Sequence, residues 1–340
     1  MMMSAKPMIA ACRWRGGWPV LPITQSKFVT SMAIVVFCCL ALVMPGRAAG
    51  EPLAPVKPGL AGGQEIVVLA PATPASIPLI LAVDNLPGVG LKIFHNHSQA
   101  HSLFLRNKAQ FLTTGISVGV RFFRQGVPLK IINSHVAGLS SLVSTRPVNG
   151  FGELKGEKIW LPFPGSPLEE VTRFFARSEG LVWQRDIRVG YAMFDTSVKM
   201  LQQGRIAFAA LPEPFVSLAE IHPGLVASLD YATLWERYTG TGTTCPQVGT
   251  FVNAQWAKAH PALITRFNQA LEQAIEQCAK DPGPGLERAK KRFRFPGTVL
   301  ATSLGRTRFK LLTDRELKQS VFAYYQTIGS PLDETFDDFF

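Results

Sequence analysis

Short apolar runs typical of buried strands alternate along the chain with segments whose apolar residues recur every three or four positions. Strands are expected at 66–70, 91–95, 109–113, 129–133, 139–144, 157–161, 186–190, 205–210, 225–229 and 247–252. Helices are expected at 77–86, 99–106, 167–179, 195–203, 213–221, 259–278 and 313–328, and another from Thr114 or Ser117 to Gln125. This alternation predicts an α/β protein with mostly parallel sheets covered by helices on both faces.

The stretch 150–181 shows the pattern most clearly, with a strand, a glycine loop and then a helix. Ser166 stands at the N-cap position, Pro167 at the first helical position and Glu169 three residues after the cap, which predicts a capping box. A helix that starts just beyond a strand end offers free N–H groups and a positive dipole end to an oxyanion. The alternative is an ordinary αβ connection that binds nothing. Thr313 and Glu316 predict a second capping box.

The first 49 residues are predicted to be a signal peptide. No acidic residue occurs before Glu51, and an apolar core of 14 residues spans 31–44, too short for a membrane span of about 20. Small residues follow at 48–50 and suit cleavage. We therefore expect export to the periplasm, and the proline- and glycine-rich residues 50–64 are expected to form a flexible N-terminal tail.

Removal of the leader changes the charge balance. The whole chain has 35 basic and 24 acidic residues, and five of the basic ones lie in the leader, so the mature part is mildly basic. The basic run 288–294 is compatible with nucleic acid or a membrane, but a solvated helix face is the commoner explanation. An exported protein would not meet nucleic acid, so no such partner is expected.

Two cysteines remain after cleavage, Cys245 and Cys278. Export permits a disulfide between them. Cys278 falls on the apolar face of a predicted helix, where a buried free thiol is the ordinary outcome. The alternatives stay open at this point.

Two αβ units and a helical C-terminus predict a two-lobed clamp. The first lobe is assigned to 65–147 and 248–340, and the second lobe to 148–247. The chain is expected to cross between the lobes near 144–152 and again near 247–251, and the two crossings would act as a hinge.

Five segments in this order resemble the periplasmic solute-binding proteins of the nitrate/sulfonate/taurine class of ATP-binding-cassette importers. They are FHNHSQAHSLFLRNKAQFLTTG (94–115), GVPLKIINSHVAGLSSLVS (126–144), GELKGEKIWLPFPGSP (152–167), LQQGRIAFAALPEP (201–214) and TFVNAQWAKAHPALITRFNQAL (250–271). The resemblance covers about 65–330. It implies the type II periplasmic-binding-protein fold, in which two αβ lobes close over a small solute, without catalysis and without a cofactor.

The resemblance implies a site at the carboxyl ends of the strands, where ligands bind in open sheets. The candidate residues carried over by position are Thr73, Ser76, Thr113, Thr114, Gly115, Pro164, Gly165, Ser166 and Glu213. Hydroxyls and backbone N–H groups suit an anion such as a sulfonate or nitrate, whereas Glu213 is expected to point away or to contact a donor. Plain helix capping is the alternative role of Thr113, Thr114 and Ser166.

Three histidines near the second strand depart from that pattern. His95 and His97 would share a face of a strand, and His101 on the following helix could join them. Three imidazoles can hold zinc or copper, but no acidic residue lies nearby to orient them. His95 and His97 are taken as candidate pocket-wall residues, with a surface or structural role as the alternative, and no metal ligand is assigned.

The expected function is that of a monomeric import receptor that carries a small solute to a membrane permease and its ATPase subunit. The chain contains no phosphate-binding loop, no nucleophile elbow and no HExxH motif. The alternatives are binding of a thiamine-pyrimidine precursor, a thiamine-pyrimidine synthase or menaquinone-pathway enzyme on the same fold, and a sensory receptor. The leader argues against both enzymes, and the cysteine-rich iron motif of the synthases is absent.

Overall fold

The computed structural model describes residues 65–240 and 244–340. The predicted signal peptide, 1–49, and the predicted tail, 50–64, lie outside the described residues. Within the described part of the chain, no helix is long and apolar enough to cross a membrane.

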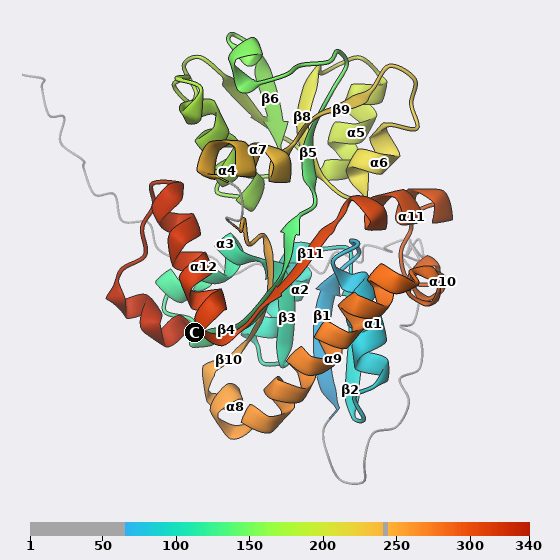
Figure 1. The fold of residues 1–340 in the computed structure, drawn as a ribbon, viewed down its shortest axis with the longest axis vertical. Helices are drawn as coiled ribbons and strands as arrows, with labels where there is room; N and C mark the ends of the chain where they lie inside the picture. Colours follow the sequence, from blue (N-terminus) through green and yellow to red (C-terminus); the bar gives the residue numbers. More distant parts are fainter. Residues whose placement is uncertain (1–64, 241–243) are drawn as a thin grey trace, which may run out of the picture. The chain divides into compact units, whose positions relative to one another are not determined.

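The first sheet has the strand order β11-β4-β10-β3-β1-β2 (Figure 1). Its strands are β1 (Ile66–Pro71), β2 (Val89–Phe94), β3 (Phe111–Gly115), β4 (Leu129–Gly138), β10 (Val248–Asn253) and β11 (Arg308–Leu312). β1 pairs in parallel with β2 and β3, whereas β10 runs antiparallel to β3 and β4, and β11 antiparallel to β4. The sheet is therefore mixed rather than mostly parallel, because the returning segments enter it in the opposite direction.

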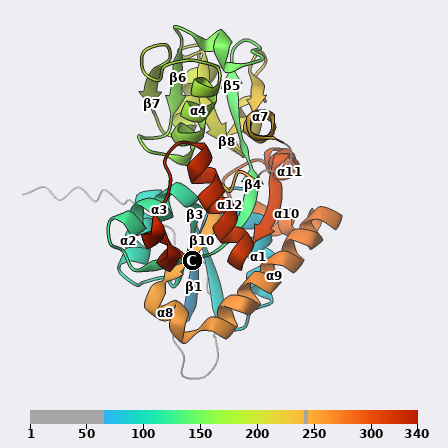
Figure 2. The ribbon, with the colours of Figure 1, turned by 60° about the vertical axis from the view of Figure 1, so that its left-hand side comes forward.

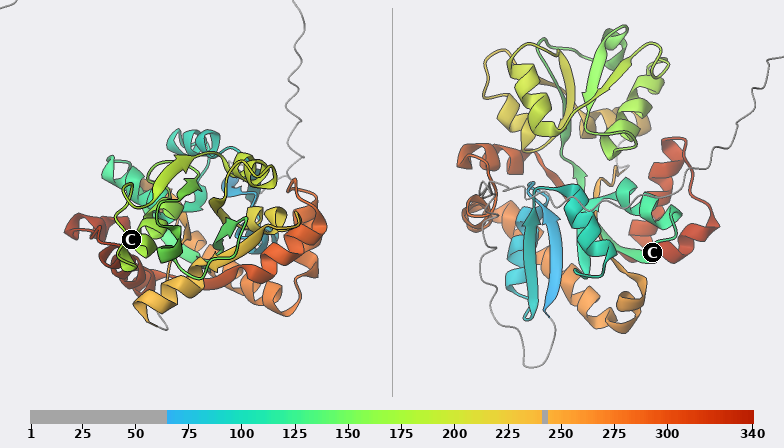
Figure 3. Two further views of the ribbon diagram at one scale, coloured as in Figure 1. Left: turned by 90° about the horizontal axis from the view of Figure 1, so that it is seen from above. Right: turned by 180° about the vertical axis from the view of Figure 1, so that it is seen from behind.

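Alternation along β1 divides the apolar core of this sheet between two faces. Val68 and Ala70 pack with one apolar cluster, and Val67 and Leu69 pack with another, as the period of two in a strand requires. The first face is covered by α1 (Ser76–Asp84), α8 (Ala254–Ala259), α9 (Pro261–Lys280), α10 (Gly283–Lys290) and α11 (Gly297–Arg306). The other face carries α2 (His97–Leu105), α3 (Ile116–Arg124), α12 (Asp314–Thr327) and the 3₁₀ helix η2 (Glu334–Phe339) (Figure 3).

The second sheet has the order β7-β6-β8-β5-β9. Its strands are β5 (Ser140–Ser144), β6 (Lys158–Leu161), β7 (Arg188–Tyr191), β8 (Phe208–Pro212) and β9 (Val226–Asp230). One face packs on α4 (Pro167–Ser178), α7 (Tyr231–Thr239) and the 3₁₀ helix η1 (Phe151–Leu154), and the other on α5 (Phe194–Gln202) and α6 (Phe215–Ala219). β6 is parallel to β7 and β8, and β5 is antiparallel to β8 and β9, so this sheet is also mixed.

The chain passes between the two sheets at Gly138–Ser140, where β4 runs directly into β5 (Figure 2). The prediction of a crossing near 144–152 was wrong, because Val143 and Ser144 already pair with β8 and β9. The returning chain lies beside this crossing, since the Gln247 N–H donates to the Val136 carbonyl at 2.9 Å. An edge strand of the first sheet was not predicted: β11 follows α11 and pairs with β4, with Arg308 opposite Gly138. The predicted lobe boundary at 147 shares the error of the predicted crossing, because it places β5 in the first lobe. The boundary at 248 stays a prediction.

Contacts between the two halves continue beyond these connections. The rings of Trp235 on α7 and Tyr324 on α12 lie 5.3 Å apart, and Arg177 on α4 donates to the Ile328 carbonyl at 2.7 Å. One apolar cluster includes residues of both sheets. On this side, α12 therefore joins the two halves through a packed core.

Two local predictions about the ends of helices had different outcomes. The break after residue 280 is confirmed, although α10 begins three residues later. The capping box at Thr313 was wrong, because the Thr313 side chain makes no cap hydrogen bond and Glu316 pairs with Lys310 at 3.2 Å. Asp314 has a φ of 48°, so the chain enters α12 through a left-handed residue that the capping pattern does not describe.

Candidate functional site

Two of the predicted loops, one from each sheet, are in direct contact. A Cβ atom added to Gly115, at the end of β3, would lie 2.6 Å from Cγ of Pro167 at the start of α4. One added to Gly165 would lie 4.0 Å from a guanidinium nitrogen of Arg121 on α3. The starts of α3 and α4 therefore face each other across the junction of the two halves.

The start of α4 is capped as predicted. The Glu169 N–H donates to Ser166 Oγ at 3.1 Å, and the Glu169 carboxylate accepts the Gly165 N–H at 2.6 Å. The same carboxylate accepts a hydrogen bond from the Tyr191 hydroxyl at 2.9 Å. Glu169 is only 8% exposed, so these bonds fix a buried side chain. Pro164 is exposed on the loop. An anion approaching this loop would meet a Gly165 N–H that the Glu169 carboxylate already binds and a Glu169 N–H that Ser166 Oγ already binds.

The start of α3 has no such cap. Gly115 at the N-cap has no side chain to accept a hydrogen bond, and no acidic residue lies in the first turn. The Ile116 N–H donates to the Gln247 carbonyl at 3.1 Å. Ser117 is 6% exposed, and its Oγ has no hydrogen-bond partner among the described residues.

The two threonines before α3 have different roles. Thr113 is fully buried, and its hydroxyl lies 3.1 Å from that of Thr250 on the neighbouring strand β10. The two hydroxyls therefore form a hydrogen bond within the sheet. Thr114 is 2% exposed, and its Oγ1 lies 3.4 Å from Nε2 of His101 on α2. Only Thr114 of this pair is directed toward the other candidate polar groups.

The three histidines do not form one cluster. His97 and His101 are neighbours with ring centroids 6.0 Å apart, and His101 packs edge-on against Phe122. Burial, His97 and Arg121 lower the pKa of His101 to about 4, so its imidazole is neutral at physiological pH. His95 is exposed and lies near Arg294; burial and then that charge lower its pKa. Among the described residues, no three His, Cys, Asp or Glu side chains are placed to hold a metal ion.

The loop after β1 is held mostly by its own backbone. Ser76 is fully buried and its hydroxyl donates to the Pro71 carbonyl at 2.5 Å, so it braces the turn into α1. Thr73 is half-buried, and its N–H also donates to the Pro71 carbonyl. His135 Nε2 lies 3.0 Å from the Ala75 carbonyl, and burial lowers the pKa of His135 to about 4.

Glu213 links the second sheet to α11. Its side chain is buried, with a residue exposure of 2%, and it accepts the Ser217 N–H at 3.1 Å. Arg306 of α11 lies 3.6 Å from the other carboxylate oxygen and also pairs with Glu220. Burial raises the pKa of Glu213, and the Ser217 donors and Arg306 oppose that rise. The expectation that Glu213 contacts a donor is met by groups of the protein itself.

Arg121 is a polar residue beside these loops that was not among the candidates predicted from the sequence. Its guanidinium carbon lies 6.0 Å from the Phe163 ring centroid, so an α3 side chain reaches the loop before α4. A signal was available in the spacing. Ser117 and Arg121 are four residues apart, which places them on one side of α3, and Thr114 lies in β3, two residues before that helix begins.

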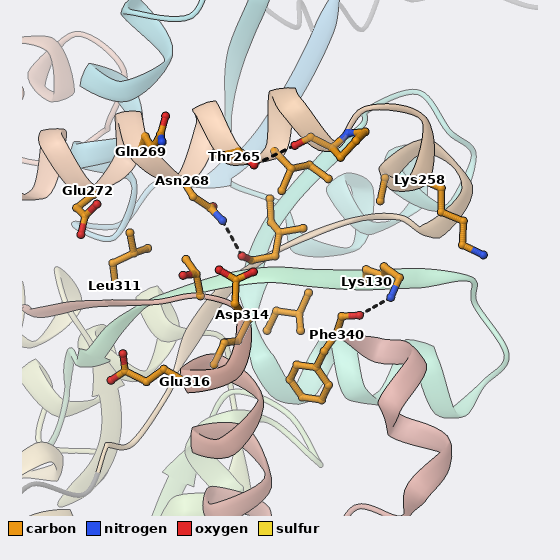
Figure 4. A pocket seen from close by; sticks show the side chains of 17 residues that line it. Lys130, Lys258, Thr265, Asn268, Gln269, Glu272, Leu311, Asp314, Glu316 and Phe340 are labelled. Atoms are coloured by element: carbon orange, nitrogen blue, oxygen red, sulfur yellow. Dashed lines mark hydrogen bonds between the residues drawn. The ribbon is translucent and has the colours of Figure 1, made fainter.

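A recess of about 600 Å³ lies elsewhere, between β4, α9 and the start of α12 (Figure 4). It includes Lys130, Asn268, Glu272 and Asp314 from these elements, and none of the predicted residues. Lys130 contacts the carbonyl of the terminal Phe340, which closes one end of the recess. The recess is separate from the facing helix starts and was not predicted.

No family model matches the sequence, and no curated protein matches it. Solved structures do match. The ligand-binding component of an ABC-type import system from Staphylococcus aureus, solved with zinc bound, has a TM-score of 0.66 at 14% identity, over 82% of this chain and 96% of that one. The periplasmic aliphatic sulfonate-binding protein SsuA from Escherichia coli has a TM-score of 0.65 at 17% identity, over 78% and 86%. The periplasmic nitrate-binding protein NrtA from Synechocystis PCC 6803 gives 0.57 at 14% identity, over 74% of each chain.

These likenesses establish the fold: two α/β halves of the type found in two-lobed periplasmic binding proteins. Within that class, the matched structures include sulfonate- and nitrate-binding proteins, so the resemblance stated from the sequence motifs is confirmed at the level of the fold.

Proposed function

We propose that the chain is the extracytoplasmic solute-binding component of an ABC-type importer. It binds a small solute between its two halves, closes on it and delivers it to a membrane permease driven by a separate ATPase. The chain acts as a monomer in the periplasm, without catalysis and without a cofactor. Within the type II fold, the observation that carries the proposal is the meeting of helix starts from the two sheets at Gly115 and Pro167.

The connections support relative motion of the halves. The segments at Gly138–Ser140 and at Gln247 are hydrogen-bonded neighbours, as twin hinge strands should be. Arg306 and Arg308 form ion pairs with Glu220 and Asp230 of the second half, on half-exposed side chains. Half-exposed pairs contribute little stability, about 0–1 kcal/mol each, so they can exchange during a hinge motion.

The test measures closure directly. The purified protein is titrated with alkanesulfonates, taurine, nitrate, small carboxylates and pyrimidines at millimolar concentration, and small-angle X-ray scattering follows its radius of gyration. Thermal unfolding is followed in parallel, because a ligand at 100 times its Kd stabilises the folded state by about 2.7 kcal/mol. A solute that gives both a smaller radius and a higher midpoint supports the proposal. No response to any solute, together with no small molecule in native mass spectra of the freshly purified protein, contradicts it.

A further inference from the structure

We propose that the basic run at the end of α10 is a docking surface for an anionic lipid bilayer. The ligand is an array of phosphate-bearing lipid headgroups. The basic surface consists of five exposed side chains: Arg288, Lys290, Lys291, Arg292 and Arg294. This inference rests on the proposed function only for the location of the protein outside the cytoplasm, and it adds a second binding surface, remote from the solute.

Positive charge is concentrated in this part of the chain. Residues 280–296 contain six basic and two acidic side chains, which gives a net charge of +4. The chain beyond the predicted leader, residues 50–340, contains 30 basic and 24 acidic residues, a net charge of +6. Most of that excess therefore lies in one short segment. Clusters of about 4–8 Lys and Arg residues are typical of proteins that bind anionic lipid.

The fold directs these side chains outward. Ala289 is fully buried and Phe293 is 4% exposed, whereas the basic residues on either side of them are all exposed. A Cβ atom added to Gly285 would lie 2.7 Å from Ile77, so α10 packs closely on α1. Figure 1 shows α10 at the edge of the first half, outside α1. The cations are therefore carried on a fixed outer face of the protein.

Three of these cations have no acidic partner. Arg288 pairs with Asp84 at 2.7 Å, and Lys290 pairs with Glu287 at 2.5 Å. No ion pair between described residues includes the other three members of the basic surface. Like charges this close in the chain repel one another, and an anionic surface would offset that repulsion.

The basic surface has no apolar anchor, and this favours lipid over an acidic protein as its partner. None of the large hydrophobic side chains that are exposed among the described residues falls within 280–296. The centre of a protein–protein interface is enriched in aromatic residues and depleted in lysine. Headgroups in a fluid bilayer, in contrast, rearrange around separate point charges and need no fitted pocket.

Binding through these charges is weak and reversible. Each Lys or Arg beside an anionic membrane strengthens binding roughly fivefold, so the three unpaired cations together contribute roughly 100-fold. The effect falls off within a Debye length of about 8 Å at physiological salt, so charges elsewhere on the protein add little. Such an interaction concentrates the protein at the membrane without holding it there, which suits a carrier that must leave to collect another solute.

The experiment measures binding to vesicles by co-sedimentation at about 0.15 M salt. Vesicles of phosphatidylglycerol mixed with phosphatidylethanolamine are compared with vesicles of phosphatidylcholine. The test variant combines three substitutions: Lys291→Gln, Arg292→Gln and Arg294→Gln. The control variant removes the same charge from exposed positions of the second half that no ion pair between described residues includes: Lys155→Gln, Lys199→Gln and Arg205→Gln. All proteins have the same amino terminus, verified by mass spectrometry, so that lipid binding by the first residues affects each equally.

Wild type should bind the phosphatidylglycerol vesicles and not the phosphatidylcholine vesicles. The test variant should bind roughly 100-fold more weakly, and the control variant should stay within about threefold of wild type. Equal binding of wild type and the test variant, at equal unfolding midpoints, overturns the inference. Equal losses in the two variants also overturn it, because they indicate a general effect of net charge.

Two further outcomes separate the alternatives. If wild type binds neither kind of vesicle, the inference is overturned, and a solvated face or an acidic protein partner is left as the explanation of the basic run. If millimolar inorganic phosphate at constant ionic strength displaces the protein, the surface binds free phosphate and not a bilayer, which also overturns it. If the test variant unfolds earlier, Lys291→Gln alone replaces it, with an expected loss of roughly fivefold, and unchanged binding overturns the inference. Solute binding is measured separately, so the proposed function stands or falls independently.

Discussion

Gly115→Ala is the most direct probe of the contact between the two halves. Gly115 has φ −62° and ψ 140°, which any residue adopts, so alanine causes no backbone strain here. Its new Cβ would lie 2.6 Å from Pro167 Cγ and 3.7 Å from Pro167 Cδ. An ordinary carbon–carbon contact is about 3.5–4.0 Å, so the two helix starts must separate by roughly 1 Å.

The magnitude follows from two opposing effects. Overpacking by one methyl costs about 1–3 kcal/mol. Replacement of glycine by alanine in a compatible conformation returns about 0.4–1 kcal/mol by restricting the unfolded chain. We expect a net destabilisation of about 1–2 kcal/mol if the halves stay together, or an unchanged stability with a larger radius of gyration if they separate.

Gly305→Ala in α11 is the matched control. Its added Cβ meets nothing within 4 Å, and a helical glycine replaced by alanine gains about 0.5–1 kcal/mol. Urea unfolding of the three proteins measures the free energies, and small-angle X-ray scattering measures the radius. If Gly115→Ala stabilises the protein as much as the control does, with an unchanged radius, the contact between α3 and α4 is refuted.

Three further predictions concern single side chains. Glu169→Gln weakens the charge-assisted bonds to Gly165 and Tyr191 and should lower the free energy of unfolding by about 1–2 kcal/mol in urea; no loss would contradict the capping role. Glu170, whose pKa is raised to about 7, keeps its proton in the folded state while an unfolded carboxyl loses it near 4.5, so stability should fall as pH rises from 4.5 to 7. Glu170→Gln should remove that fall from the pH profile of urea unfolding, and an unaltered profile would exclude Glu170 as its source. Cys245 and Cys278 are free and buried, with pKa values raised to about 12 and about 11 by burial, so a thiol reagent at pH 8 should modify both only in urea, and rapid labelling of the native protein would contradict their burial.

The buried strands of the first sheet were predictable because each contains a short run of apolar residues. β1, β3 and β10 lie within a few residues of the predicted runs. The segment 283–312 was not assigned, although it forms α10, α11 and β11. β11 is an edge strand with alternating exposure, and its basic residues hide the apolar pattern that the prediction relied on.

The crossing between the sheets was misplaced for a similar reason. β4 continues through Ser134, His135 and Gly138, polar or flexible residues that interrupt an apolar run. Those residues are held by partners that are distant in the sequence: Ser134 Oγ donates to the Val248 carbonyl at 3.1 Å, across 114 residues. Local patterns carry no information about such pairings, so the extension of β4 could not be derived from them.

Of the candidate site, local capping was predictable and long-range contacts were not. Ser166 and Glu169 bond within one turn, and the sequence spacing alone reveals them. The Thr113–Thr250 bond spans 137 residues and only the fold reveals it. Cys245 and Cys278 illustrate the same limit, because spacing left the disulfide open and the structure leaves both thiols free.

The property that makes a helix start predictable also reduces its value as an anion site. The capping box at α4 fixed that helix in the sequence because Ser166 and Glu169 satisfy N–H groups that an anion would need. For α3, the sequence pattern allowed a start at either Thr114 or Ser117, because no side chain caps this helix. The missing cap coincides with a Ser117 hydroxyl that has no partner among the described residues, and a hydroxyl is a group that an oxyanion can use. In a protein whose halves meet at two helix starts, the weakly marked start is therefore the better candidate for the solute.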